Sequence, residues 1–172
     1  MSLIYCGIGS RETPQDVITI MEGLGKALAE RGHTLRSGAQ PKGADGAFER
    51  GCDSVGGNKE IYLPWPGAFR RSNTEPGIKT HSSQEAMDLA EKYHPNWAAC
   101  SRDARLFHAR NGHIALGWFL DKPADLCICW TPNASASGGT GQAIRICEAY
   151  NIPVFDLADP ESFDKLDNFP GI

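Results

Sequence analysis

The sequence lacks long hydrophobic runs. The longest apolar stretches, 114–120 and 126–130, fall far short of the roughly 20 residues that a helix needs to cross a bilayer. No charged leader with an apolar core precedes the strand-like segment that starts at Leu3. These features predict a cytoplasmic protein that makes no contact with a membrane.

The sequence also has little excess charge of either sign, with 17 Lys and Arg against 21 Asp and Glu. The acidic surplus lies in the segment 156–172, so the rest of the chain is electrically balanced. This balance argues against a broad, salt-dependent nucleic-acid surface. It leaves a local basic groove open for single-stranded DNA, whose candidates between positions 70 and 110 are Arg70, Arg71, Lys79, Arg102 and Arg105.

Metal-binding spacings are missing as well. Cys127 and Cys129 lie in a strand-like run and have no second Cys or His pair at zinc spacing, and the histidines form no recognisable ligand pattern. The six cysteines occur mostly inside apolar patterns, which favours reduced thiols packed in a core. We therefore expect no metal site, no bound cofactor and no disulfide framework.

Apolar periodicity alternates between short buried strands and amphipathic helices. Strands are predicted at 3–8, 33–37, 60–63, 124–131 and 152–157, and helices at 13–31, 43–52, 83–93, 101–120 and from 142. This alternation predicts an α/β fold of the Rossmann-like, three-layer type, with a mostly parallel sheet and helices on both faces. Residues 1–157 form the predicted single domain, 64–82 a long loop or lid, and 158–172 an acidic tail.

In such a sheet, ligands bind beyond the carboxyl ends of the strands, and three loops rich in small residues are predicted to leave those ends. The first, at 7–11, joins a strand to a helix, and its glycines would let backbone amides approach an anion beside a serine and an arginine. A tight packing turn is the alternative. The spacing is not that of the dinucleotide-binding fingerprint.

The second loop runs from Ser37-Gly38 to a helix that begins near Gly43. Asp45 in the first helical turn either balances the helix dipole or accepts a hydrogen bond from a ribose hydroxyl. Glu49 lies four residues further along the same helical face, so both carboxylates are candidates for catalysis, although this spacing more often belongs to a solvated helix face.

The third loop, 135–141, is a run of Ser, Gly and Thr immediately before a predicted helix, a composition typical of a phosphate-binding helix start. A flexible linker is the alternative. Further upstream, Arg110-Asn111 interrupts an apolar helical stretch, where a buried arginine needs either an anionic ligand or an ion pair with an acid such as Asp103. Trp65, Trp97 and Trp130 could stack a base or belong to the core.

Taken in order, these segments resemble the Rossmann-like domain of the DNA-processing protein DprA and the wider superfamily of the Lonely-guy phosphoribohydrolases. The resemblance rests on Gly7-Ile8-Gly9-Ser10-Arg11, Ser37-Gly38 with Gly43-Ala44-Asp45, Arg110-Asn111, and 137–143, and it spans residues 3–157. It implies a site for a nucleotide or nucleic-acid phosphate, and a homodimer. The Lonely-guy enzymes use a glutamate where this chain has Ile144.

Three functions follow as hypotheses. The first is binding of a nucleotide or nucleotide derivative, the second is hydrolysis of a nucleotide N-glycosidic bond with Asp45 or Glu49 as the acid, and the third is binding of single-stranded DNA in recombination. The predicted ligand-binding residues are Gly7, Gly9, Ser10, Arg11, Ser37, Gly38, Gly43, Asp45, Arg110, Asn111, Thr131, Ser137, Gly138, Gly139, Thr140 and Gly141.

Overall fold

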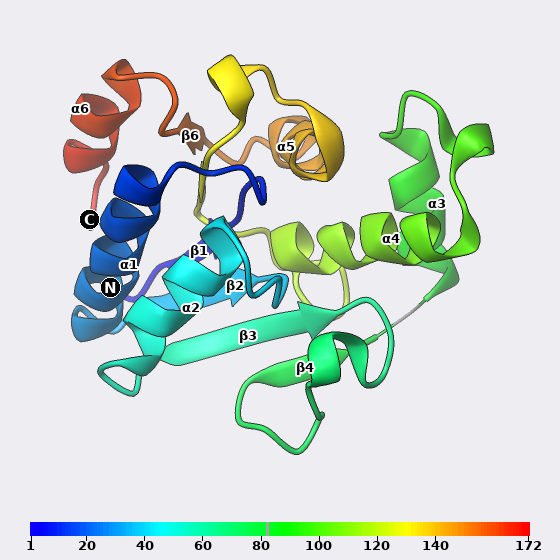
Figure 1. The fold of residues 1–172 in the computed structure, drawn as a ribbon, viewed down its shortest axis with the longest axis horizontal. Coiled ribbons are helices and arrows are strands. Elements are labelled where there is room, and N and C mark those ends of the chain that lie inside the picture. The colour runs from blue at the N-terminus through cyan, green and yellow to red at the C-terminus, as the bar shows by residue number, and fades with distance from the viewer. Residues whose placement is uncertain (82) are drawn as a thin grey trace.

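The structure is a computed structural model that describes residues 1–81 and 83–172. A parallel sheet of six strands forms its centre, in the order β4-β3-β2-β1-β5-β6 (Figure 1). The three-layer Rossmann-like fold expected from the sequence is confirmed. The strands are β1 (Ile4–Gly7), β2 (Thr34–Ser37), β3 (Asn58–Leu63), β4 (Ile78–Thr80), β5 (Leu126–Cys129) and β6 (Val154–Asp156).

Helices cover both faces of the sheet. They are α1 (Gln15–Glu30), α2 (Ala44–Asp53), α3 (Gln84–Lys92), α4 (Arg102–Leu116), α5 (Gly138–Ala149) and α6 (Glu161–Asp167). Side chains of α1, α2 and α6 pack with one set of strand residues, and side chains of α4 and α5 with the other set. Among the described residues, every helix is too short or too polar to cross a lipid bilayer.

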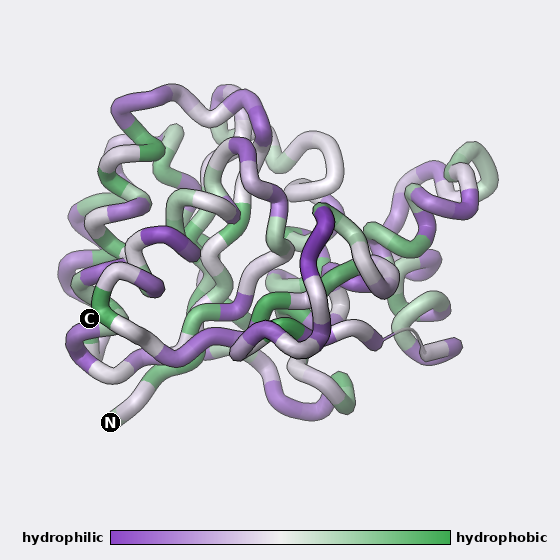
Figure 2. The backbone as a smooth tube through the Cα atoms, turned by 60° about the horizontal axis from the view of Figure 1, so that its bottom comes forward, coloured by the Kyte–Doolittle hydropathy of each residue, from purple (hydrophilic) through white to green (hydrophobic). Residues whose placement is uncertain are grey.

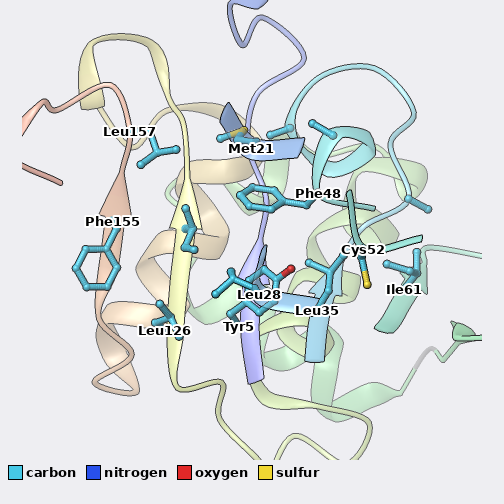
Figure 3. Close-up of a cluster of buried hydrophobic side chains, with 14 of the residues drawn as sticks. Tyr5, Met21, Leu28, Leu35, Phe48, Cys52, Ile61, Leu126, Phe155 and Leu157 are labelled. Carbon is cyan, nitrogen blue, oxygen red and sulfur yellow. The ribbon is translucent and has the colours of Figure 1, made fainter. Parts of the chain in front are cut away.

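The larger core lies between the sheet and the pair α1 and α2. Phe48 of α2 is fully buried there, with its ring edge-on to Tyr5 of β1 at 6.1 Å between centroids, and Met21 and Leu28 of α1 complete the layer (Figure 3). In Figure 2 hydrophobic and hydrophilic stretches alternate along the coiled outer segments. This alternation is that of amphipathic helices, whereas strands β1 and β5 are buried along most of their length, as their apolar runs predict.

Two helix ends differ from the prediction. The helix expected to reach residue 120 stops at Leu116, because Gly117 takes a positive φ of 81° that a continuing helix does not allow. The helix expected to begin near residue 142 begins at Gly138, so the glycine run forms the first helical turn and not a loop ahead of it.

Residue 82 lies outside the described residues, and the rest of the predicted long loop or lid, 64–81, contains regular structure. It contains a short 3-10 helix, η1 (Ala68–Arg70), and the edge strand β4, which pairs with β3. The predicted acidic tail also folds: α6 buries Leu166 against the larger core, and Phe169 packs edge-on to Phe155. Only three residues of β4 pair with the sheet, which is too short a run to stand out amid proline and glycine.

We predict that Phe48→Ala destabilises the protein by about 3–5 kcal/mol, because the substitution leaves a cavity in a fully buried position. Urea denaturation followed by circular dichroism measures the change. Ile20→Ala, at a side chain that is 41% exposed on α1, is the matched control and should change stability by less than about 1 kcal/mol. Equal losses for the two variants would contradict this assignment of the core.

Candidate functional site

A cleft of about 480 Å³ opens beyond the carboxyl ends of the strands. It lies where the chain reverses its direction across the sheet, between β1 and β5, which are neighbours although the chain visits β2, β3 and β4 between them. This switch point is where open α/β sheets bind ligands. The segments that follow β1, β2, β3 and β5 contribute to its lining, together with one face of α4.

From the first predicted loop, Gly9, Ser10 and Arg11 line the cleft, whereas Gly7 does not. Gly7 ends β1, and a Cβ there would lie 2.6 Å from the ring of Phe48, so this glycine serves core packing. Gly9 brings the loop equally close to α2, since its Cβ would meet the Cβ of Ala44 at 2.6 Å. The first loop is therefore both a packing turn and part of the cleft wall.

From the second loop, Ser37 and Gly43 support the cleft from behind. The Ser37 hydroxyl donates to the carbonyl of Gly7 at 2.6 Å and ties β2 to β1. Gly43 caps α2 with a φ of 94°, and a Cβ there would lie 2.5 Å from the carbonyl oxygen of Ser10. Both predicted ligand residues hold the first two loops against each other and do not line the cleft.

The guanidinium of Arg110 lies almost fully buried at the floor of the cleft. It donates to the carbonyl of Gly38, and to that of Tyr62 at 3.2 Å. A Cβ at position 38 would lie 2.6 Å from Nη1 of Arg110 and 2.7 Å from Oδ2 of Asp45, so the guanidinium and the carboxylate both occupy the space beside this glycine. The acid near Arg110 is thus Asp45, and not Asp103 in the exposed first turn of α4.

Burial dominates the ionisation of this pair. Desolvation raises the pKa of Asp45 to about 6, although the charge of Arg110 and the backbone groups of Gln40 and Gly9 lower it. Desolvation likewise lowers the pKa of Arg110, against the raising effect of Asp45. The carboxyl group is therefore poised to gain or lose a proton near neutral pH, which is the property of a general acid or base.

Glu49 does not share the cleft with Asp45, contrary to the prediction that one helical face brings both carboxylates to the same crevice. Its carboxylate is paired with Lys59 at 2.9 Å and with Arg71 at 2.8 Å, and it lines a separate shallow cavity. Hydrogen bonds and charge from those partners outweigh desolvation and lower the pKa of Glu49. Its role in the structure is that of an ion-paired acid, so only Asp45 of the two predicted carboxylates lines the cleft.

The third predicted loop borders the cleft through Ser137, Gly138, Gly139 and Thr140. A Cβ added at Gly138 or Gly139 would meet no atom within 4 Å, so the start of α5 faces open space. Within the described part of the chain, no side chain caps this helix start. The positive end of the helix dipole and the first amides of α5 therefore point into the cleft, and no described side chain accepts hydrogen bonds from these amides.

Two predicted ligand residues near this helix are structural. The Thr131 hydroxyl donates to the carboxylate of Asp156 and accepts from the amide of Ala136 at 3.1 Å, which shapes the loop after β5. Gly141 lets the same loop pack onto α5, because a Cβ there would overlap the carbonyl of Ala136. Neither residue lines the cleft.

Asn111 connects the floor of the cleft with α5. Its amide donates to the carbonyl of Gly139 at 3.1 Å and to Oε1 of Gln142 at 3.0 Å. Gln142 is fully buried, and its own amide nitrogen has no partner among the described residues. The position of the α5 start is thus fixed from below by α4.

The sequence reasoning did not single out the aromatic and polar residues that complete the lining. Of these, Phe107 and Phe69 form an apolar wall with ring centroids 6.1 Å apart, and Trp65 packs against Phe107 from outside the cleft. A signal existed for α4, because Phe107, Arg110, Asn111 and Ile114 follow helical spacing on one face. The remaining polar lining residues missed are Glu12, Gln40 and His108.

The prediction of no metal site rested on the spacing of cysteines and histidines along the sequence. The fold brings together side chains that this spacing does not relate. His94, Cys100 and His108 come from three different segments, and their potential ligand atoms lie within 4.8 Å of one another. A fully buried thiol group, Cys6 with Cys127 and Cys147, is similarly close within the smaller core. The six cysteines are free, and five of them are buried.

The fold has known relatives. A Moco carrier protein from Chlamydomonas reinhardtii superposes with a TM-score of 0.59 at 18% identity, covering 98% of this chain and 86% of that one. The DNA processing protein A of Helicobacter pylori superposes with a TM-score of 0.62 at 16% identity, covering 95% of this chain and 72% of that one. The resemblance to DprA is confirmed at the level of the fold. No protein-family model and no curated protein matches the sequence.

We predict that Asp45 makes stability depend on pH in a direction opposite to most carboxylates. Because its pKa rises from 3.8 to about 6 on folding, the protonated form is favoured in the native state, and stability is lost as the pH rises through this window. Relative to Asp45→Asn, the wild type should lose roughly 3 kcal/mol of unfolding free energy across that rise.

Urea denaturation at a series of pH values measures the difference. Asp103→Asn, which removes an exposed carboxylate from the same region, is the control and should follow the wild type. A difference between wild type and Asp45→Asn that does not change with pH would show that Asp45 is not desolvated as described.

Proposed function

We propose that this protein binds a nucleotide or nucleotide derivative in the cleft, with a phosphate group at the start of α5. The observation that carries the proposal is the open helix start at Gly138 and Gly139, which borders the cleft without a side-chain cap from the described residues. Helix starts of this kind bind phosphate through backbone amides and the helix dipole. The twelve residues of α5 are enough for a full dipole effect at its first turn.

The charges and shape of the cleft support the same ligand class. Arg11 is exposed on the wall that faces α5, and the buried Arg110 adds a positive charge at the floor. Guanidinium groups are well suited to phosphate oxygens. Phe69 and Phe107 offer an apolar wall on which a planar ring can pack, and the volume lies within the ordinary range of small-molecule sites.

The structural neighbours favour a ligand site on this fold. One is named for carrying the molybdenum cofactor and another for binding single-stranded DNA. The first experiment is therefore native mass spectrometry of freshly purified protein, with denaturing extraction and weighing of any small molecule. A mass in the range of nucleotides supports the proposal. A mass equal to that of the molybdenum cofactor would identify that cofactor as the ligand in place of a nucleotide. If no small molecule is found, nucleotide binding is tested by titration.

We predict that Gly139→Asp weakens nucleotide binding at least tenfold, which is about 1.4 kcal/mol, because it places a negative charge at the phosphate position. The added side chain meets open space, so the fold should be preserved. Gly139→Asn has nearly the same shape without the charge and is the matched control. Isothermal titration with a panel of mono- and dinucleotides measures the dissociation constants.

A smaller loss is expected for Arg11→Ala, with Arg31→Ala, at the far end of α1, as its control. Equal affinity of Gly139→Asp and Gly139→Asn for each nucleotide that binds would place the phosphate elsewhere. Failure of every nucleotide to bind the wild type would remove the proposal.

Hydrolysis of an N-glycosidic bond is the second candidate, and the environment of Asp45 favours it. A carboxyl group with a pKa of about 6 can protonate a leaving base or accept a proton from water at neutral pH. Ile144, at the position of the Lonely-guy glutamate, is buried in the smaller core and supplies no acid. Of the two predicted catalytic carboxylates, Asp45 and Glu49, only Asp45 would take part in hydrolysis.

If the protein is a hydrolase, Asp45→Asn should lower base release from nucleotides at least a hundredfold while leaving nucleotide affinity within a few-fold. Chromatographic detection of free base measures the rate, and Glu49→Gln is the control because that carboxylate lies outside the cleft. If the wild type releases no base at high enzyme concentration, the protein is not a hydrolase of these nucleotides, and only the binding proposal stands.

Single-stranded DNA remains a third, weaker proposal. Of the basic residues considered for it, Arg71 is engaged with Glu49 and Glu75, and Arg105 donates to the carbonyl of Trp97. A gel shift that weakens steeply with salt would favour DNA over a small molecule. Light scattering of the same sample tests the proposed dimer.

A further inference from the structure

Three side chains with metal-binding atoms meet beside the cleft. His94 follows the end of α3, Cys100 follows the short 3-10 helix η2 (Trp97–Ala99), and His108 lies in α4. The Cys100 sulfur lies 3.6 Å from Nε2 of His94, and the two imidazole rings are 4.4 Å apart between centroids. All three side chains are only partly buried, so a dissolved ion has access to them.

These separations suit one transition-metal ion. Zinc bonds to sulfur at about 2.3 Å and to imidazole nitrogen at about 2.0–2.1 Å, so a tetrahedral centre places sulfur and nitrogen roughly 3.6 Å apart. The distance between Cys100 and His94 has this value before any ion is bound. A set of one thiolate and two imidazoles suits zinc, although the same set also holds copper in trigonal sites. It disfavours magnesium and calcium, which prefer oxygen ligands.

A second, independent observation points to a ligand. Nδ1 of His108 is buried and makes no hydrogen bond of ordinary geometry within residues 1–81 and 83–172, although the side chain of Gln142 lies against this ring. Buried imidazole nitrogens are ordinarily paired, so this ring has bonding capacity left for an ion. His94 is already engaged, because its Nδ1 accepts from the amide of Asn96 at 3.1 Å. Zinc binding at Nε2 would exchange that single hydrogen bond for a metal bond, a small loss against the affinity of thiolate-imidazole sites.

We propose that His94, Cys100 and His108 form a zinc site with three protein ligands. The fourth position is open to water or to an anionic group in the cleft, because His108 belongs to the cleft lining. Guanidinium groups near the cluster favour an anion at that fourth position: Arg145 donates to the carbonyl of Tyr93, Arg105 to that of Trp97, and Arg110 lies on the same helix as His108. This site goes beyond the proposed function and does not depend on it.

The position of the cluster gives the ion a structural effect as well. Helix α3 and its connection to α4 project at one side of the molecule (Figure 1). Among the described residues, the buried apolar cluster there consists of Ala86, Ala90 and Ala109, with Met87, Trp97 and Leu120 partly buried against it. A zinc ion bound by His94 and Cys100, near the two ends of the connection between α3 and α4, and by His108 of α4 would fix this projecting part beside the cleft. Metal ions stabilise proteins in this way where the apolar core is small.

The test uses the full chain, reduced and freed of metal by a chelator, and titrated with Co²⁺ in the absence of nucleotide. We expect one equivalent of Co²⁺ to produce a sulfur-to-metal charge-transfer band with tetrahedral ligand-field bands, and Zn²⁺ to displace it. Cys100→Ser and His94→Gln should abolish the charge-transfer band, whereas His94→Cys, which keeps a zinc-competent ligand set, should retain it with greater intensity.

Two controls separate this site from other thiols and histidines. Cys147→Ser alters the fully buried thiol group of the smaller core, and His81→Asn removes a histidine outside the cluster; both should keep the band. Circular dichroism of the metal-free variants confirms that each one folds. A wild type without the band, or a band that survives in Cys100→Ser or disappears in Cys147→Ser, would overturn the proposal. Because no nucleotide is present, the result is independent of ligand binding in the cleft.

Discussion

The burial of one positive charge organises the cleft. Arg110 projects from α4 beneath the carboxyl ends of the strands, where its guanidinium is held by the carbonyls of Gly38 and Tyr62. A buried guanidinium is costly unless hydrogen bonds and a countercharge compensate it. Asp45 supplies the countercharge, although desolvation raises its pKa to about 6. Below that pH the carboxyl group is protonated, and the guanidinium loses its countercharge.

This arrangement explains why small residues surround the cleft for several different reasons. Gly38 leaves room beside it for the guanidinium and the carboxylate, and Gly43 takes a backbone conformation that other residues rarely adopt. Gly7 and Gly141 serve packing, whereas Gly138 and Gly139 border open space. Similar glycine-rich segments thus divide into those that build the cleft and those that face a ligand.

The sequence predicted the alternation of strands and helices because the buried strands and amphipathic helices have distinct periods, and it placed the loops that meet at the switch point. The sequence alone could not distinguish candidate residues that face a ligand from candidate residues that hold the structure together. Thr131 looks like a phosphate ligand in sequence, yet its hydroxyl is used by Asp156 and Ala136. Glu49 shares a helical face with Asp45, yet Lys59 and Arg71 arrive from other elements to pair with it. The meeting of His94, Cys100 and His108 likewise depends on the turn between α3 and α4, which no spacing encodes.

The outer strands have a consequence for solubility. A parallel sheet that does not close into a barrel exposes unpaired backbone groups along both edges, and such edges invite pairing with another chain. Here both edges, β4 and β6, are only three residues long. Few backbone donors and acceptors remain available to an incoming strand, so the fold limits edge-to-edge aggregation by the brevity of its outermost strands.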